Sequence, residues 1–218
     1  LLVQRHPKLL TFASTNIGWI TAWMNPERPC RGDRFGSGQG KYPWKVVTSQ
    51  EMSPLLESDQ QDPMGAPPVV LALLVHQPGT WFSETLASIA GQDYPRIQTV
   101  AFITSVSPTE EISRQIRGAL PDAVIRIVEG NPGFGPVMNE VQRIVEGVGG
   151  FFCFAHDDVA LRSDTITKLI EETFRSNAGV VGPKLVQWDD PSVLQHVGLG
   201  ADRIGEIDSL IEFGEKDQ

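Results

Sequence analysis

The sequence has few cysteines and few basic residues, and each shortage argues against a class of protein. Its only cysteines, Cys30 and Cys153, lie far apart, and the second lies inside an apolar run. A disulfide framework is therefore not expected. Lys and Arg together number 18 against 27 Asp and Glu, which gives a net charge of -9. Proteins that bind nucleic acid along its phosphates need clustered Lys and Arg, so the composition predicts no nucleic acid partner.

Long hydrophobic runs are also missing. No stretch reaches the roughly 18 consecutive apolar residues that span a bilayer, and the first residues lack the basic, apolar and small segments of a signal peptide. The sequence therefore predicts a cytoplasmic protein. With this acidic balance, a small anionic ligand would need local help from a metal ion or from backbone amides.

Two regions of the chain differ in texture. Residues 1–67 carry scattered Pro, Gly, Ser and Gln without a sustained helical or strand period, which predicts an N-terminal arm of low order. In residues 68–218, short apolar runs alternate with amphipathic stretches. This rhythm is typical of an α/β domain with a mostly parallel sheet flanked by helices.

Five apolar runs in the second region predict strands, at 69–75, 99–103, 124–128, 151–155 and 180–186. Apolar residues at helical spacing follow each of the first four runs. Right-handed crossovers between parallel strands put every strand-to-helix loop at the carboxyl edge of the sheet, where ligands bind. The loops predicted to meet there are 76–80, 104–108, 131–136 and 156–162.

The strongest local signal is the segment HDDV after the fourth predicted strand. Asp157 and Asp158 follow an all-apolar run, and buried carboxylates cost several kcal/mol each unless something compensates them. Mg²⁺ or Mn²⁺ would do so, because these ions bind through one or two carboxylates and take further ligands from water and substrate phosphates. The alternative is that the pair merely ends a strand and caps the following turn.

A second signal is the segment NPGFGP after the third predicted strand. Gly133 and Gly135 permit positive φ and a close approach of the backbone to a ligand, and Pro136 suits the first position of a helix whose amides point at that ligand. Asn139, one turn into this helix, is a polar residue predicted to face the same edge. A plain turn is the alternative, since the segment is not a dinucleotide-binding fingerprint.

Four segments, taken in order, resemble the first half of a family 2 glycosyltransferase domain, which has the fold called GT-A. They are VHQPG, TWFSETLASIAGQDYP, GNPGFGPVMNEV and FFCFAHDDVAL, and the resemblance covers about residues 69–218. The later stretch VVGPKLVQWDDPSVLQHVGLGADRIGE is similar to large actinobacterial-type members that carry membrane segments elsewhere in the chain.

The resemblance implies a glycosyltransferase that moves a hexosyl or related sugar from a UDP- or dTDP-type donor to a hydroxyl of a glycan or lipid-linked acceptor. It implies inverting transfer with Mn²⁺ or Mg²⁺ as cofactor, in synthesis of cell-envelope polysaccharide or glycolipid. Membrane association would come only from segments not present here, which would place the full-length protein at the inner face of the cell membrane.

The resemblance also implies roles for particular residues. Asp157 and Asp158 would be catalytic, with Asp158 and His156 as metal ligands and Asp157 orienting the sugar or a water on the metal. The nucleotide-sugar donor would lie against Val75, His76, Gln77, Thr104, Ser105, Asn131, Gly133, Gly135 and Asn139.

Two departures from the family pattern affect these roles. The family's second strand usually ends in an Asp that contacts the nucleotide, whereas Thr104 or Ser105 would supply only a hydroxyl here. The first Asp of the metal motif is replaced by His156, and an imidazole suits Mn²⁺ better than Mg²⁺.

The general base of an inverting enzyme lies well after the metal motif in this family, so we expect a catalytic domain truncated at its C-terminus, with its base beyond Gln218. Asp189 and Asp190 are the nearest substitutes, and they resemble a surface turn. Two other hypotheses stay open: a non-catalytic nucleotide-binding module of the same fold, and another phosphate-handling α/β enzyme. A receiver domain would use Lys184, but HQP after the first strand lacks the required carboxylate.

Overall fold

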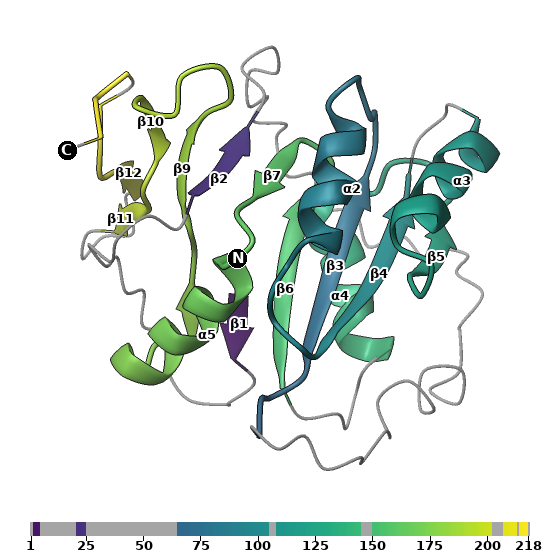
Figure 1. Ribbon diagram of the computed structural model, residues 1–218, viewed down its shortest axis with the longest axis horizontal. Helices are drawn as coiled ribbons and strands as arrows, with labels where there is room; N and C mark the ends of the chain where they lie inside the picture. Colours follow the sequence, from purple (N-terminus) through teal and green to yellow (C-terminus); the bar gives the residue numbers. More distant parts are fainter. Residues whose placement is uncertain are drawn as a thin grey trace.

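The computed structural model describes residues 2–4, 21–24, 65–104, 108–144, 150–201, 207–212 and 214–217. They form a six-stranded sheet with helices on both faces, a four-stranded sheet and a two-stranded sheet (Figure 1). The elements in chain order are β1 (Leu2–Gln4), β2 (Thr21–Met24), β3 (Val69–Val75), α2 (Phe82–Ala90), β4 (Ile97–Ile103), α3 (Thr109–Ala119), β5 (Val124–Ile127), α4 (Phe134–Ile144), β6 (Phe151–His156), β7 (Val159–Leu161), α5 (Thr165–Ser176), β8 (Val180–Val181), β9 (Lys184–Gln187), β10 (Leu194–His196), β11 (Leu199–Ala201) and β12 (Ile207–Ser209).

The large sheet has the order β5-β4-β3-β6-β1-β8. Four of its six strands, β5, β4, β3 and β6, are parallel to one another. The strand β1 pairs antiparallel with both β6 and β8. A mostly parallel core of strands joined by helices is the predicted α/β, Rossmann-like fold, which is therefore confirmed.

The strand order reverses at β3. From β3 the chain builds outward through β4 to β5, and it then returns to place β6 on the other side of β3. At such a reversal the loops leaving the two neighbouring strands run in opposite directions and open a crevice beyond their carboxyl ends, which is where ligands bind in open α/β sheets. The chain's topology thus marks the edge between β3 and β6.

The side chains of β3 alternate between two buried clusters, as strand geometry requires. Val69, Leu71, Leu73 and Val75 pack in the cluster to which α2, α3 and α5 contribute, whereas Val70, Ala72 and Leu74 pack in the cluster that includes α4. Figure 1 shows α2 and α3 on one face of the sheet and α4 on the other. Every residue of β3 is buried, which explains its continuous apolar run.

Several predicted boundaries need correction, including those of β4, which begins at Ile97, and β5, which ends at Ile127. The fourth strand extends to His156, and the crossover after it contains the short strand β7. The run predicted as one fifth strand is divided into β8 and β9, which belong to different sheets, because Pro183 between them cannot donate to a ladder. The helix α4 begins at Phe134, so Pro136 is its third residue, still in the first turn where no intrahelical donor is needed.

Most of the N-terminal arm predicted for residues 1–67 lies outside the described residues. Besides residues 65–67, two short stretches of it are described, and both are strands: β1 pairs with β6 and β8, while β2 pairs with β7 and β9. Strands of three and four residues are too short for a period to be visible in the sequence. None of the helices in the described ranges is long and apolar enough to cross a membrane.

Replacing Leu71 by alanine should lower the free energy of unfolding by about 2–5 kcal/mol, because a buried leucine leaves a cavity that its neighbours fill only partly. Leu71 has no exposed surface, whereas 50% of Leu210 is exposed. The matched control Leu210→Ala should therefore change stability by less than about 1 kcal/mol. Urea denaturation measures both, and equal losses would contradict the placement of β3 in the core.

Candidate functional site

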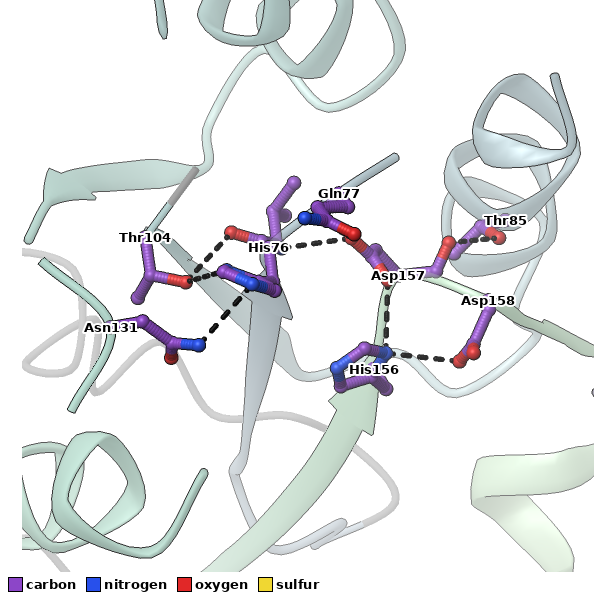
Figure 2. A network of polar contacts seen from close by, with 9 residues as sticks. His76, Gln77, Thr85, Thr104, Asn131, His156, Asp157 and Asp158 are labelled. Carbon is purple, nitrogen blue, oxygen red and sulfur yellow. Dashed lines mark hydrogen bonds and ion pairs between the residues drawn. The ribbon is translucent and has the colours of Figure 1, made fainter. Parts of the chain in front are cut away.

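Four loops meet at the carboxyl edge of the parallel strands, as predicted. His76 and Gln77 follow β3, Thr104 follows β4, Asn131 lies between β5 and α4, and the acidic pair follows β6. Figure 2 shows these side chains gathered into one polar network. The network spans the reversal between β3 and β6.

Asp157 ties the ends of β6 and β3 together. Its side chain is fully buried, and its Oδ2 accepts hydrogen bonds from the backbone amides of His76 at 2.8 Å and Gln77 at 3.1 Å. The hydroxyl of Thr85, on α2, donates to the backbone carbonyl of Asp157 at 3.2 Å. The carboxylate thus satisfies two amides at the tip of β3, a bracing role that the sequence did not predict. The sequence gives no sign of this role for Thr85, because a buried threonine carries no distinctive signal.

His156 lies between both carboxylates of the acidic pair. Its Nδ1 is 2.9 Å from Oδ1 of Asp157 and 3.0 Å from Oδ1 of Asp158. Burial alone would lower the pKa of His156, but the hydrogen bonds and negative charges of Asp157 and Asp158 outweigh it and raise this pKa to about 9. An imidazolium therefore balances part of the buried negative charge.

The same three side chains have the chemistry of a divalent cation site. Each offers one ligand atom, and these atoms lie within 4.8 Å of one another. One imidazole nitrogen with carboxylate oxygens is a donor set that suits Mn²⁺ and later transition ions. A cation would take the place of the proton on His156, since a metal-bound imidazole nitrogen cannot carry a proton.

A second group of hydrogen bonds joins the ends of β3 and β4 to the glycine turn. Nδ1 of His76 is 3.0 Å from Oγ1 of Thr104, and Nε2 of His76 is 3.2 Å from Nδ2 of Asn131. The amide of Gly133 donates to Oδ1 of Asn131 at 3.2 Å. The amide and hydroxyl of the buried Thr104 donate to the carbonyl of Val75 at 2.8 and 3.4 Å.

Only some of the remaining predicted residues lie in positions that fit their predicted roles. Gln77 is exposed at the edge, and Gly133 has a φ of 86°, a conformation that favours glycine. Gly135 does not use the positive φ that a glycine permits, because it lies in the first turn of α4. Asn139 is exposed on α4 and takes no part in the hydrogen bonds given above. Ser105 lies outside the described residues.

Comparison with known proteins finds only distant likeness. No family model matches this chain, and no curated protein matches its sequence. Among solved structures, the chain is similar to S. aureus TarS 1–349 in complex with UDP-GlcNAc, with 18% identity and a TM-score of 0.42 over 50% of this chain and 32% of that one. The structure of TarS 1–349 in complex with UDP gives 21% identity and a TM-score of 0.43, over 50% and 33%. The chain spans about a third of these proteins, and similarity at this level carries no argument about function.

Asp157→Ala should lower the free energy of unfolding by about 2–4 kcal/mol, because it leaves two amides of the crevice without an acceptor. Asp157→Asn keeps an acceptor oxygen and should lose less. The exposed residue Asp189 provides the matched control, and Asp189→Ala should stay within about 0.5 kcal/mol of the wild type. Chemical denaturation with a chelator present measures the stability of all three variants. An Asp157→Ala variant as stable as the Asp189→Ala control would contradict the bracing role of Asp157.

The raised pKa of His156 predicts a pH dependence of stability in metal-free protein. A pKa raised from 6.5 to about 9 on folding means that the folded state holds the proton more tightly. The resulting stabilisation is full below about pH 6.5 and is lost as the pH rises through about 9. The free energy of unfolding, measured across this window, should fall more in the wild type than in His156→Gln. Identical pH profiles would show that His156 is not held by the carboxylates.

Proposed function

We propose that this chain is the nucleotide-sugar-binding part of a GT-A glycosyltransferase, which moves a sugar from a nucleoside diphosphate donor to an acceptor hydroxyl. One observation carries the proposal. The acidic pair, the tip of β3 and the glycine turn are joined by hydrogen bonds at the reversal between β3 and β6, the position at which open α/β sheets bind nucleotides.

The donor's diphosphate would meet backbone amides rather than a basic surface. The start of α4 follows directly on Gly133, and the first turn of a helix carries amides without intrahelical partners and a partial positive charge. The positive φ of Gly133 lets this backbone approach a ligand closely. Asn131 and Gln77, both exposed, would add hydrogen bonds to the nucleoside or the sugar. This supply of donors suits a chain whose net charge is -9.

His156 and Asp158 would hold Mn²⁺, or less favourably Mg²⁺, as the cofactor. When bound, such a cation neutralises the negative charge that builds on the leaving diphosphate. Asp157 would act mainly by positioning other groups of the protein. One of its oxygens already accepts from two amides, and the other lies against His156. It would keep the imidazole and the tip of β3 at fixed positions around the donor.

The finer parts of the proposal concern the acceptor side. Inverting transfer requires a general base to take the proton of the acceptor hydroxyl in line with the breaking bond. We propose that this base lies well after the acidic pair in the chain, on a part that also binds a glycan or lipid-linked acceptor. In the full protein we propose a place in cell-envelope polysaccharide or glycolipid synthesis at the inner face of the cell membrane.

A non-catalytic nucleotide-binding module is the second candidate, and one observation favours it. The acidic pair is compensated by groups of the chain itself, because Asp157 accepts from two amides and both carboxylates pair with His156. The cluster therefore does not need a metal ion in order to fold. Such a module would bind a nucleotide equally well with and without a cation.

Calorimetry of UDP and dTDP with and without Mn²⁺ distinguishes these candidates. For the glycosyltransferase we expect at least one nucleotide to bind at least about tenfold more tightly with Mn²⁺, since a cation that neutralises the diphosphate would contribute more than about 1.4 kcal/mol. Asp158→Ala should abolish this gain, and the exposed control Asp189→Ala should keep it. Metal-independent binding that survives Asp158→Ala would favour the non-catalytic module. Absence of binding by both nucleotides would contradict both candidates.

A further inference from the structure

We infer that His76 is a positioning residue that holds the turn of Asn131 and Gly133 against the ends of β3 and β4 through one fixed imidazole tautomer. This inference deepens the proposed function, because that turn is where we place the donor. The hydrogen bonds that define it belong to the unliganded chain, so they can be tested without any ligand.

The direction of each hydrogen bond can be assigned in sequence, starting from the backbone amide of Gly133. The amide of Gly133 can only donate, and it is 3.2 Å from Oδ1 of Asn131. This contact fixes the orientation of the Asn131 side chain and leaves its NH₂ group facing Nε2 of His76 at 3.2 Å. An amide NH₂ only donates, so Nε2 of His76 must accept and carry no proton.

The proton of the neutral ring must then be on Nδ1. Nδ1 lies 3.0 Å from Oγ1 of Thr104 and donates to it. The hydroxyl of Thr104 in turn donates to the carbonyl of Val75 at 3.4 Å. Every hydrogen bond from Gly133 to Val75 thus has a defined direction. The opposite tautomer would place two donors face to face at Nε2, and its bare Nδ1 would meet the oxygen of Thr104 while the hydroxyl proton points to Val75.

Both ring nitrogens of His76 are therefore used inside the protein. The ring is half-buried, whereas Asn131 is exposed and uses one of its two N–H donors on His76. The ring consequently has no nitrogen to offer to a ligand, and the ligand-facing donor of this group belongs to Asn131. The role of His76 is to hold Asn131, and a ligand contact by its imidazole is not needed.

The backbone of His76 extends the same function to the acidic pair. Its amide donates to Asp157 at 2.8 Å while its ring reaches Asn131 (Figure 2). One residue thus fixes the glycine turn on one side of the reversal and the acidic pair on the other. A side-chain substitution removes the first contact and leaves the second, which separates the two.

The first test is the protonation pattern of His76 in unliganded protein at mildly alkaline pH. Long-range ¹H–¹⁵N NMR spectra distinguish a protonated Nδ1 from a protonated Nε2, and His76→Asn assigns the signal. We expect Nδ1 protonated and Nε2 bare. A ring protonated at Nε2, or one that exchanges between both tautomers, overturns the inference.

Two matched variants test which contact positions the turn. In His76→Asn the amide reaches only the position of Nδ1, so it can still donate to Thr104 but no longer reaches Asn131. In His76→Gln the amide reaches the position of Nε2, so its oxygen can accept from Asn131 but the contact with Thr104 is lost. We expect the Gly133 amide to exchange with solvent about fivefold faster in His76→Asn, the factor for one hydrogen bond, and at nearly the wild-type rate in His76→Gln.

Measuring UDP affinity in the presence of Mn²⁺ tests whether the position of the turn affects nucleotide binding. His76→Gln should bind UDP within about twofold of the wild type and His76→Asn about fivefold more weakly. Equal losses in both variants, or no loss in either, overturn the inference, and thermal unfolding of both variants excludes a general loss of the fold. If wild-type protein binds neither UDP nor dTDP, the proposed function fails, while the NMR spectra and the exchange rates of Gly133 still decide the role of His76.

Discussion

The site depends on one buried carboxylate. Asp157 leaves β6 on one side of the reversal in strand order, and its Oδ2 accepts from two consecutive amides at the tip of β3 on the other side. An amide that is withdrawn from water without a partner costs free energy comparable to a lost hydrogen bond. A parallel sheet offers no ladder partner beyond its last residue, so the loop after β3 must find an acceptor elsewhere. Asp157 supplies it, and the ends of β3 and β6 are thereby held together.

The buried negative charge of Asp157 and its neighbour Asp158 limits which ligands the site can bind. Asp157 and Asp158 are both buried, and one imidazolium between them leaves a net negative charge. A diphosphate would be repelled from this position unless further positive charge came with it. The first turn of α4 supplies partial charge only, so a divalent cation in place of the proton on His156 is the simplest way to combine these carboxylates with an anionic ligand. A proton and a metal ion would then be alternatives at Nδ1 of His156.

The sequence predicted the parts of the fold that have long, uniform patterns. The run Val69–Val75 became a strand buried on both faces, and the four loops after the parallel strands do meet, because right-handed crossovers leave no other arrangement. Short strands were missed, since β7 and the two N-terminal strands comprise only three or four residues each, and the apolar run from 180 to 186 concealed a change of sheet at Pro183. Patterns of one residue type cannot show where a ladder changes partner.

Within the site, the sequence identified residue types but not their partners. The adjacency of Asp157 and Asp158 suggested a shared role, yet the two carboxylates differ, because only Asp157 accepts from the tip of β3. Gly133 and Gly135 looked equivalent, and only Gly133 has a positive φ. The pairing of His76 with Asn131 spans 55 residues and left no signal in either segment. Such contacts arise from topology, which brings chain-distant polar residues to one edge.

The topology also explains why the two halves of the site can act together. The glycine turn and the acidic pair lie on opposite sides of the reversal and have separate loops, so the sheet alone would let each adjust independently. His76 connects them at the end of β3, with its amide on Asp157 and its ring on Asn131. A ligand that bridged both sides would meet donors whose spacing is set before it arrives, and it would lose less conformational entropy in ordering them. The central strand therefore leads directly into the one residue that contacts both the acidic pair and the glycine turn among the hydrogen bonds given above.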